Sequence, residues 1–209
     1  MNLLEHLQWR YATKKFDSTK KVSSNDIEKL KQAIQLSVSS YGLQLYKVLI
    51  VENPEIREQL KPVSWNQSQI TDASHLVVFC NYTEATSEAI DAFIKQTAIT
   101  RNQDLERLNG YGDFIKSKLA EKSEAEKTSW LKSQTYLALG NLLNACAELK
   151  IDACPMEGFE PEAYNQILGL DKQGLNAAVI APIGYRHKED YTIGLPKVRK
   201  PMHILFETV

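Results

Sequence analysis

Residues 128–150 read Thr-Ser-Trp-Leu-Lys-Ser-Gln-Thr-Tyr-Leu-Ala-Leu-Gly-Asn-Leu-Leu-Asn-Ala-Cys-Ala-Glu-Leu-Lys. Apolar side chains recur around much of the circumference of a helix with this sequence, and the small residues Ala138, Gly140 and Ala145 lie among them. A helix that is apolar on most sides is buried in a core or at a contact between subunits. The stretch therefore predicts a central helix on which the other elements pack.

Apolar runs on both sides of this helix predict strands. Residues 43–51 and 75–80 precede the helix, and residues 176–184 follow it. These runs are rich in Val, Ile and Leu and are bounded by residues typical of turns, as buried strands are. A shorter strand is expected at 151–154, directly before the turn Pro155-Met-Glu-Gly158.

Helical spacing of apolar residues predicts further helices at 23–38, before the first strand, and at 54–61 and 161–168, between strands. Residues 85–122 predict two partly exposed helices, separated at Asn109-Gly-Tyr-Gly112. Strands and helices are thus interspersed along the chain. The basic segment 195–201 leads into the apolar residues 203–206, which is consistent with a solvated arm or with an arm packed on a neighbouring subunit.

The composition indicates a folded chain that forms a single domain over residues 1–209. Among 209 residues, 25 Lys and Arg are balanced by 26 Asp and Glu, and 43% are hydrophobic. The small net charge argues against nonspecific nucleic-acid binding. Cys80, Cys146 and Cys154 form no Cys-x-x-Cys motif, and no apolar run approaches the length of a membrane helix, so we expect a reducing, cytoplasmic location and no membrane partner.

Common catalytic and metal-binding motifs are absent from the sequence. It contains no Gly-x-x-x-x-Gly-Lys, Gly-x-Gly-x-x-Gly, His-Glu-x-x-His or Gly-x-Ser-x-Gly, and its four histidines are widely separated, so no metal site is expected. The clearest chemical signal is a pair of basic clusters, Arg10 with Lys14 near one end and Lys197 with Arg199 near the other. Brought together, these cations would suit a phosphate monoester, and the alternative is a solvated basic surface.

Several short motifs, in order along nearly the whole chain, resemble the nitroreductase family, in particular the branch of oxygen-insensitive nitroreductases, flavin reductases and dihydropteridine reductases. The motifs are Arg10-Tyr-Ala-Thr-Lys-Lys-Phe-Asp17, Ser39-Ser40 with Gln44, Asn66 ahead of Asp72-Ala-Ser-His75, Gln134-x-Tyr136-Leu-Ala-Leu-Gly-Asn141, Pro155-Met-Glu-Gly158 and Leu195-Pro-Lys-x-Arg199.

The resemblance implies an α+β sandwich in which a central, mostly antiparallel sheet is flanked by helices. It also implies an intertwined homodimer, with the arm at about 195–209 reaching the partner subunit and the helix at 128–150 in the dimer core. The implied activity is that of an FMN-dependent oxidoreductase, which transfers hydride from NAD(P)H through flavin N5 to nitroaromatics, quinones or related small acceptors in a ping-pong cycle. The alternatives are a dihydropteridine or free-flavin reductase, reduction of an activated double bond, and an FMN-binding module with little turnover.

The resemblance also assigns cofactor-binding residues, while no side chain is expected to act as a nucleophile. Arg10, Lys197 and Arg199 match positions that hold the FMN phosphate, and Lys14 and Asn66 match positions that bond the ribityl chain and pyrimidine edge. Residues of the turn, Pro155, Met156, Glu157 and Gly158, match the segment whose N–H near Glu157 faces flavin N5. The remaining cofactor-binding assignments are Tyr11, Ala12 and Gly42, and Ser39 and Ser40, which match positions that the second subunit supplies. Tyr41, Tyr111 and Phe114 are candidates for a lid or substrate pocket, and simple helix packing is an equal alternative for them.

Some residues depart from the pattern of the family. Ala12 stands where many members have Ser, Gly42 stands where Asn is common, and Leu45-Tyr46 replaces Pro-Trp. Gln69 stands where similar proteins have a Lys near the flavin pyrimidine. Because a neutral amide stabilises a reduced, negatively charged flavin less than a cation does, we expect Gln69 to change the redox potential.

Overall fold

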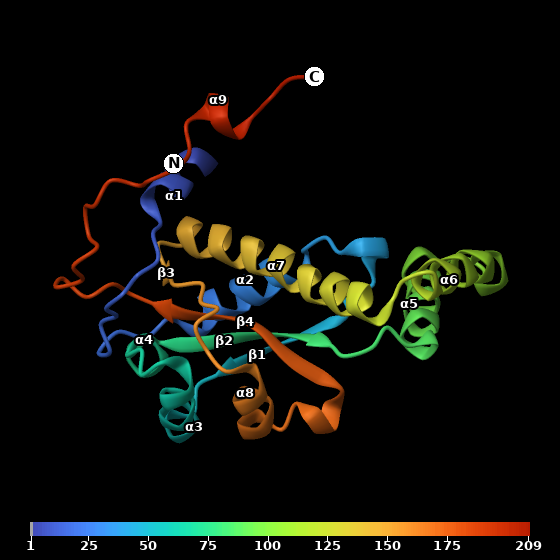
Figure 1. Ribbon diagram of the computed structural model, residues 1–209, viewed down its shortest axis with the longest axis horizontal. Helices are drawn as coiled ribbons and strands as arrows, with labels where there is room; N and C mark the ends of the chain where they lie inside the picture. Colours follow the sequence, from blue (N-terminus) through green and yellow to red (C-terminus); the bar gives the residue numbers. More distant parts are fainter. Residues whose placement is uncertain (1) are drawn as a thin grey trace.

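A four-stranded antiparallel sheet forms the centre of the protein in a computed structural model, which describes residues 2–209 (Figure 1). The strands are β1 Tyr46–Val51, β2 His75–Tyr82, β3 Asp152–Ala153 and β4 Leu175–Gly184. Their order across the sheet is β1-β2-β4-β3, and each pairing is antiparallel. The two inner strands, β2 and β4, are buried along nearly their whole length, which explains their continuous apolar runs.

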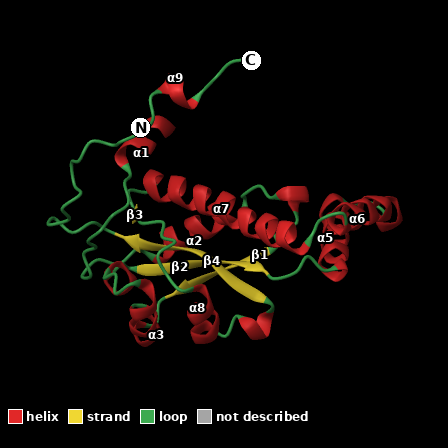
Figure 2. Cartoon of the chain, in the orientation of Figure 1, coloured by secondary structure: helices red, strands yellow, loops and turns green. Residues whose placement is uncertain are grey.

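Helices cover both faces of the sheet (Figures 1 and 2). The helices are α1 Leu3–Trp9, α2 Ser24–Gln35, α3 Pro54–Leu60, α4 Gln69–Asp72, α5 Ser87–Arg101, α6 Leu105–Ala120, α7 Glu124–Glu148, α8 Pro161–Leu168 and α9 Met202–Leu205. On one face α2 and α7 share a core with the sheet, and on the other face α3, α4 and α8 do. The predicted α+β sandwich with a mostly antiparallel sheet is confirmed.

The long helix α7 begins four residues before the predicted start at 128 and has 25 residues. Its start is fixed by a capping box, in which Ser123 and Glu126 satisfy each other's main-chain N–H groups. One side of α7 packs on the sheet through residues such as Ala138, Leu139 and Leu142. Leu137, on another side, remains 46% exposed. The single chain therefore leaves part of the apolar circumference of α7 uncovered.

The predicted break within residues 85–122 was placed wrongly. The structure has two helices there, but they are separated at Asn102–Asp104, and the two glycines lie inside α6. Asn102 ends α5 in the left-handed conformation, and the Asp104 side chain accepts a hydrogen bond from the N–H of Glu106 to cap α6. Gly112 allows close packing of the two helices, since a Cβ there would lie 3.1 Å from Cγ1 of Ile94.

Two predicted strands are shorter than expected. The predicted strand at 43–51 starts at Tyr46, because Ser40–Gly42 forms a 3₁₀ turn and Gln44 is in the left-handed region with φ +46°. The side-chain amide of Gln44 stabilises this turn by donating to the carbonyl of Gln35 at 2.8 Å. The strand predicted at 151–154 contains only the two residues of β3.

Residues 195–209 leave the sheet and extend past α1, carrying α9 near their end (Figure 1). The apolar side chains of this arm, among them Val198, Ile204 and Phe206, are exposed. The start of the arm returns to the body of the protein beside the end of α1, where it forms one wall of the site described next.

Candidate functional site

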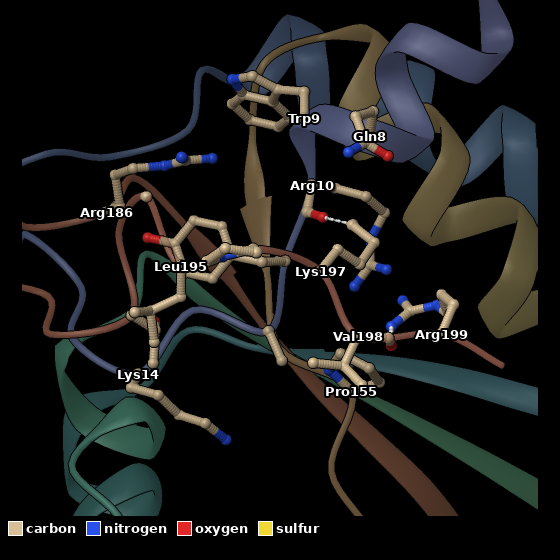
Figure 3. A pocket seen from close by; sticks show the side chains of 15 residues that line it. Gln8, Trp9, Arg10, Lys14, Pro155, Arg186, Leu195, Lys197, Val198 and Arg199 are labelled. Carbon is tan, nitrogen blue, oxygen red and sulfur yellow. Dashed lines mark hydrogen bonds between the residues drawn. The ribbon is translucent and has the colours of Figure 1, made fainter. Parts of the chain in front are cut away.

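A pocket of about 740 Å³ lies between the end of α1, the turn after β3 and the start of the C-terminal arm (Figure 3). We call it the cation pocket. The residues that line it are Gln8, Trp9, Arg10, Tyr11, Ala12, Lys14, Pro155, Arg186, Thr192, Gly194, Leu195, Pro196, Lys197, Val198 and Arg199. None of these lining residues, all of which lie within the described range 2–209, is Asp or Glu.

The two basic clusters of the sequence meet in this pocket, where Arg10, Lys197 and Arg199 lie together (Figure 3). Burial lowers the pKa of Arg10, and the charge of Arg199 lowers it further. Burial also lowers the pKa of Lys197, followed by the charges of Arg10 and Arg199. Cations that repel one another without a carboxylate in the same pocket form a site for an anion.

Lys197 has a second role, because its ammonium group ties the arm to the end of α1. It donates hydrogen bonds to the main-chain carbonyls of Leu7, at 2.8 Å, and of Arg10, and Figure 3 shows the second of these. These carbonyls belong to the last turn of α1 and the residue after it, where a cation is favourable. An ammonium group has three donors, so Lys197 retains one for a ligand.

Arg186 also lines the cation pocket, but its charge is neutralised. Its Nε donates to Oδ1 of Asp152 at 2.8 Å, and its main-chain N–H donates to Oδ2 of the same buried carboxylate at 2.7 Å. Its guanidinium lies 4.4 Å from the ring centre of Trp9 and 4.5 Å from that of Tyr11. Arg186 therefore forms a rigid wall of the pocket and leaves anion binding to the other cations.

The predicted turn Pro155–Gly158 follows Cys154 at the floor of the pocket and is fixed by several contacts. Met156 exchanges two main-chain hydrogen bonds with Ile180 of β4, at 2.8 and 3.2 Å. The carbonyl of Gly158 accepts a hydrogen bond from the side chain of Gln67 at 3.0 Å. The main-chain N–H of Glu157 has no acceptor among residues 2–209, so it is available to a ligand.

The Glu157 side chain is also held, since its carboxylate accepts a hydrogen bond from the hydroxyl of Tyr136 on α7. Burial, together with this hydrogen bond and the charge of Glu157, raises the pKa of Tyr136 to about 12. Tyr136 therefore remains a hydrogen-bond donor at neutral pH and connects the central helix to the turn.

The loop that carries Asn66 lies next to this turn. Trp65 and Asn66 both adopt left-handed conformations, with φ of +54° and +55°, and the Trp65 ring lies against Gly158. Asn66 is exposed, whereas Gln69, in the first turn of α4, is 6% exposed. Buried Arg57 fixes the end of α4 by donating to the carbonyls of Ile70, Ala73 and Ser74.

The residues predicted to come from a second subunit or from a lid do not line the cation pocket of their own chain. Ser39, Ser40, Tyr41 and Gly42 lie before β1, where the N–H of Ser40 donates to Oε1 of Gln134 on α7 at 2.8 Å. Tyr41 contacts the ring of Trp130, and Tyr111 stacks on Phe114 within α6, with ring centres 6.5 Å apart. The predicted residues that line the pocket are Arg10, Tyr11, Ala12, Lys14, Pro155, Lys197 and Arg199.

Sequence reasoning missed Trp9, Asp152, Arg186 and the buried Asp190, which organise the pocket. The one signal was an Asp inside the apolar run at 151–154. Within residues 2–209, no helix has the length and apolar character to cross a membrane, and no group of three or more His, Cys, Asp or Glu could hold a metal ion.

The chain is similar to known proteins over almost its full length. The profile of the nitroreductase family matches residues 7–185. The major NAD(P)H-flavin oxidoreductase of Aliivibrio fischeri is 34% identical over 205 residues, covering 95% of this chain and 94% of the relative. The oxygen-insensitive NAD(P)H nitroreductase of Salmonella typhimurium is 29% identical over 214 residues, covering 97% of each chain.

A solved structure of a protein assigned as a nitroreductase in complex with FMN, from Exiguobacterium sibiricum, has the same fold. It superposes with a TM-score of 0.85 at 18% identity, covering 100% of this chain and 98% of the other. The family profile spans the sheet, the central helix and the first half of the cation pocket, and the relatives extend this match through the arm. This chain belongs to the nitroreductase family.

Proposed function

We propose that the protein is an FMN-dependent oxidoreductase that uses NAD(P)H to reduce nitroaromatics, quinones or related small acceptors in a ping-pong cycle. The observation that carries the proposal is the gathering of Arg10, Lys197 and Arg199 in a pocket whose lining, within residues 2–209, has no carboxylate. A phosphate monoester supplies the negative charge that these cations lack. The names of the Aliivibrio and Salmonella relatives supply the reductant and the class of reaction.

The residues present fit FMN. The guanidinium groups of Arg10 and Arg199 and the remaining donor of Lys197 suit the phosphate. Lys14, which lines the same pocket, suits the ribityl chain, and Asn66 suits the pyrimidine edge of the ring. The unpaired N–H of Glu157 suits a ring nitrogen that accepts a hydrogen bond. When bound, the isoalloxazine ring supplies the two-electron chemistry that carries hydride from NAD(P)H to the acceptor.

The protein's own contribution is positioning. Tyr136 holds the side chain of Glu157, and Ile180 and Gln67 hold the main chain on either side of it. A turn that is fixed from three directions presents its N–H without rearrangement, which favours binding and orientation. By the resemblance to the family, Gln69 replaces a positively charged Lys and Ala12 replaces a Ser hydroxyl. We infer that these two residues influence the redox potential and the substrate preference.

We further propose that the protein, as one domain with an extended arm, works as a homodimer. Ser39, Ser40 and Gly42 lie away from the cation pocket of their own chain, which is consistent with their serving the pocket of a second copy. Exposed Leu137 on α7 and the exposed apolar arm provide surface for that contact. Size-exclusion chromatography with light scattering tests this, and a monomer at micromolar concentration contradicts it.

The purified protein tests the function directly. A yellow preparation that bleaches anaerobically with NADH or NADPH is expected. A yellow protein that stays oxidised indicates an FMN-binding module instead. A colourless protein that added FMN cannot tint contradicts the proposal.

Reduction of free flavin is the second candidate, favoured by the name of the Aliivibrio fischeri relative. A steady-state comparison of nitroarenes, quinones, free flavins and dihydropteridines, each with NADH and NADPH, separates the candidates. A preference for free flavin or dihydropteridine by kcat/KM over all nitroarenes and quinones selects the narrower activity.

A further inference from the structure

Asp190, in the loop between β4 and the arm, joins two segments of the chain that are far apart in sequence. Its Oδ2 accepts hydrogen bonds from the main-chain N–H groups of Lys14, at 2.8 Å, and Lys15, at 3.2 Å, and from the hydroxyl of Tyr11 at 3.2 Å. Its Oδ1 accepts from the N–H of Thr192 at 2.9 Å and from the hydroxyl of Thr192 at 2.6 Å. One carboxylate therefore fastens the segment after α1 to the segment that leads into the arm.

These hydrogen bonds keep the carboxylate of Asp190 charged. Asp190 is 4% exposed, and this burial raises its pKa, but the hydrogen bonds from Thr192, Lys14 and Lys15 outweigh burial, so the pKa lies below its ordinary value. A buried carboxylate that accepts several N–H bonds is a rigid connection, because releasing any donor leaves charge unsatisfied.

The two segments that Asp190 joins carry the opposite walls of the cation pocket. Arg10 and Lys14 lie on the first segment, and Lys197 and Arg199 lie on the second. Asp190 bonds the main chain of Lys14 and leaves its ammonium group unused, so it fixes the backbone without neutralising that side chain. Together with the hydrogen bonds from Lys197 to the carbonyls of Leu7 and Arg10, this connection sets the distance between the two walls and hence the fit of an anion between them.

We propose that Asp190 is a positioning residue that gives the site its preference for FMN over riboflavin. This rests on the proposed function. FMN and riboflavin share the ring and the ribityl chain, and only FMN has the phosphate that the two walls would grip together. If the connection is loosened, binding of the phosphate must also order both walls of the pocket, which costs free energy. Riboflavin has no phosphate and loses only the fixed position of Lys14 beside the ribityl chain, a loss that FMN shares.

The test compares the affinities of full-length wild-type protein and Asp190→Asn, freed of flavin, for FMN and for riboflavin. Asparagine preserves the volume but replaces one acceptor oxygen with an NH2 group, which only donates. Its remaining oxygen can accept from Lys14 or from Thr192, but not from both. We expect the Kd for FMN to rise about tenfold and the Kd for riboflavin to rise by no more than about threefold, so that the ratio of the two affinities falls.

Asp17→Asn is a matched control. Asp17 makes the same local hydrogen bonds as Asp190, accepting from the N–H of Thr19 at 3.1 Å and from its hydroxyl at 2.6 Å, but its side chain joins no wall of the pocket. The FMN to riboflavin affinity ratio of Asp17→Asn is expected to equal that of the wild type.

Two outcomes for Asp190→Asn overturn the proposal: an unchanged affinity ratio, and an equal loss of affinity for both flavins, which signifies general damage. If Asp190→Asn does not fold, Thr192→Val replaces it as the test variant, because it removes only the hydrogen bond from the Thr192 hydroxyl to Asp190. We expect Thr192→Val to lower the ratio about threefold, and an unchanged ratio overturns the proposal. Wild-type protein that binds neither flavin contradicts the proposed function itself, and this inference with it.

Discussion

The ammonium group of Lys197 donates a hydrogen bond of 2.8 Å to the main-chain carbonyl of Leu7, 190 positions earlier in the chain. The same ammonium group donates to the carbonyl of Arg10, so the arm is attached where the first cation of the pocket stands. The spacing of Arg10 and Lys197 is thus determined by main-chain geometry, whether or not an anion is present.

Arg199→Ala is expected to weaken FMN binding by about 2 kcal/mol, because it removes a charge-assisted contact with the phosphate. Fluorescence quenching of FMN in a titration measures the affinity. Lys200→Ala is the control, since Lys200 is exposed and lies outside the pocket lining although it neighbours Arg199. Equal affinity of Arg199→Ala and wild type would show that the arm does not contribute to the phosphate site.

Gly158→Ala is expected to destabilise the protein by about 1 kcal/mol, the low end of the cost of overpacking, because the added methyl group displaces the Trp65 ring, which is exposed and can move. A Cβ at Gly158 would lie 2.8 Å from Cζ3 of Trp65 and 3.1 Å from Nε2 of Gln67. Urea denaturation measures the loss, and the fluorescence of Trp65 reports the displaced ring.

Gly110→Ala is the control for this substitution. Gly110 lies inside α6, and no atom lies within 4 Å of a Cβ added there. Alanine at that position is expected to stabilise the helix by about 0.5–1 kcal/mol. If both substitutions change stability in the same direction, contact with Trp65 is not what decides the effect at Gly158.

Gln69→Lys is expected to raise the two-electron midpoint potential of the bound flavin, because a cation stabilises the negative charge of the reduced form. Anaerobic titration with a reference dye measures the potential. Gln69→Met provides a neutral comparison of similar length. A potential that falls or stays constant in Gln69→Lys refutes the electrostatic role of this position.

Stability should decrease in alkali because of Tyr164. Tyr164 is fully buried, with its hydroxyl 2.8 Å from Oγ of Ser64. Burial raises the pKa of Tyr164 to about 12 from an ordinary value near 10, and the hydrogen bond to Ser64 opposes this. A raised pKa means that the folded state favours the protonated phenol, so its contribution is complete below pH 10 and is lost as pH rises toward 12.

The expected loss between pH 9 and pH 12 is on the order of 2 kcal/mol in the free energy of unfolding. Tyr11, Tyr136 and Cys80 titrate in the same range, so the relevant quantity is the difference between wild type and Tyr164→Phe at each pH. The phenylalanine variant should be less stable by about 1 kcal/mol at pH 9 and should lose less stability on going to pH 12. Parallel pH profiles of the two proteins would contradict this role for Tyr164.

The elements with strong local signals could be predicted from the sequence. Helix α8 has the predicted bounds, because Pro161 suits the first turn and Gly169 ends the helix in the left-handed conformation. The inner strands β2 and β4 were predicted because burial on both faces produces long apolar runs. Gly110 and Gly112 do not mark the helix break, which depends on Asn102 and Asp104, and Gly112 serves packing against Ile94.

The candidate site was predictable only in part. The basic clusters suggested an anion site, and the resemblance to the family provided the reason for joining them. The partners of Asp152 and Asp190 could not be predicted, because Arg186 and Lys14 are 34 and 176 positions away from them and no periodicity relates such positions. Carboxylates of this kind resemble surface residues in the sequence, and only tertiary contacts reveal that they are buried.

The cation pocket requires both residue 10 and residue 199, whereas the last strand of the sheet ends at Gly184. A chain that is synthesised from its N-terminus therefore contains the whole sheet before it contains Lys197 and Arg199. At that stage one wall of the pocket does not yet exist. Capture of an anionic ligand must then follow synthesis, and the stabilisation that binding provides is available to finished molecules and not to nascent ones.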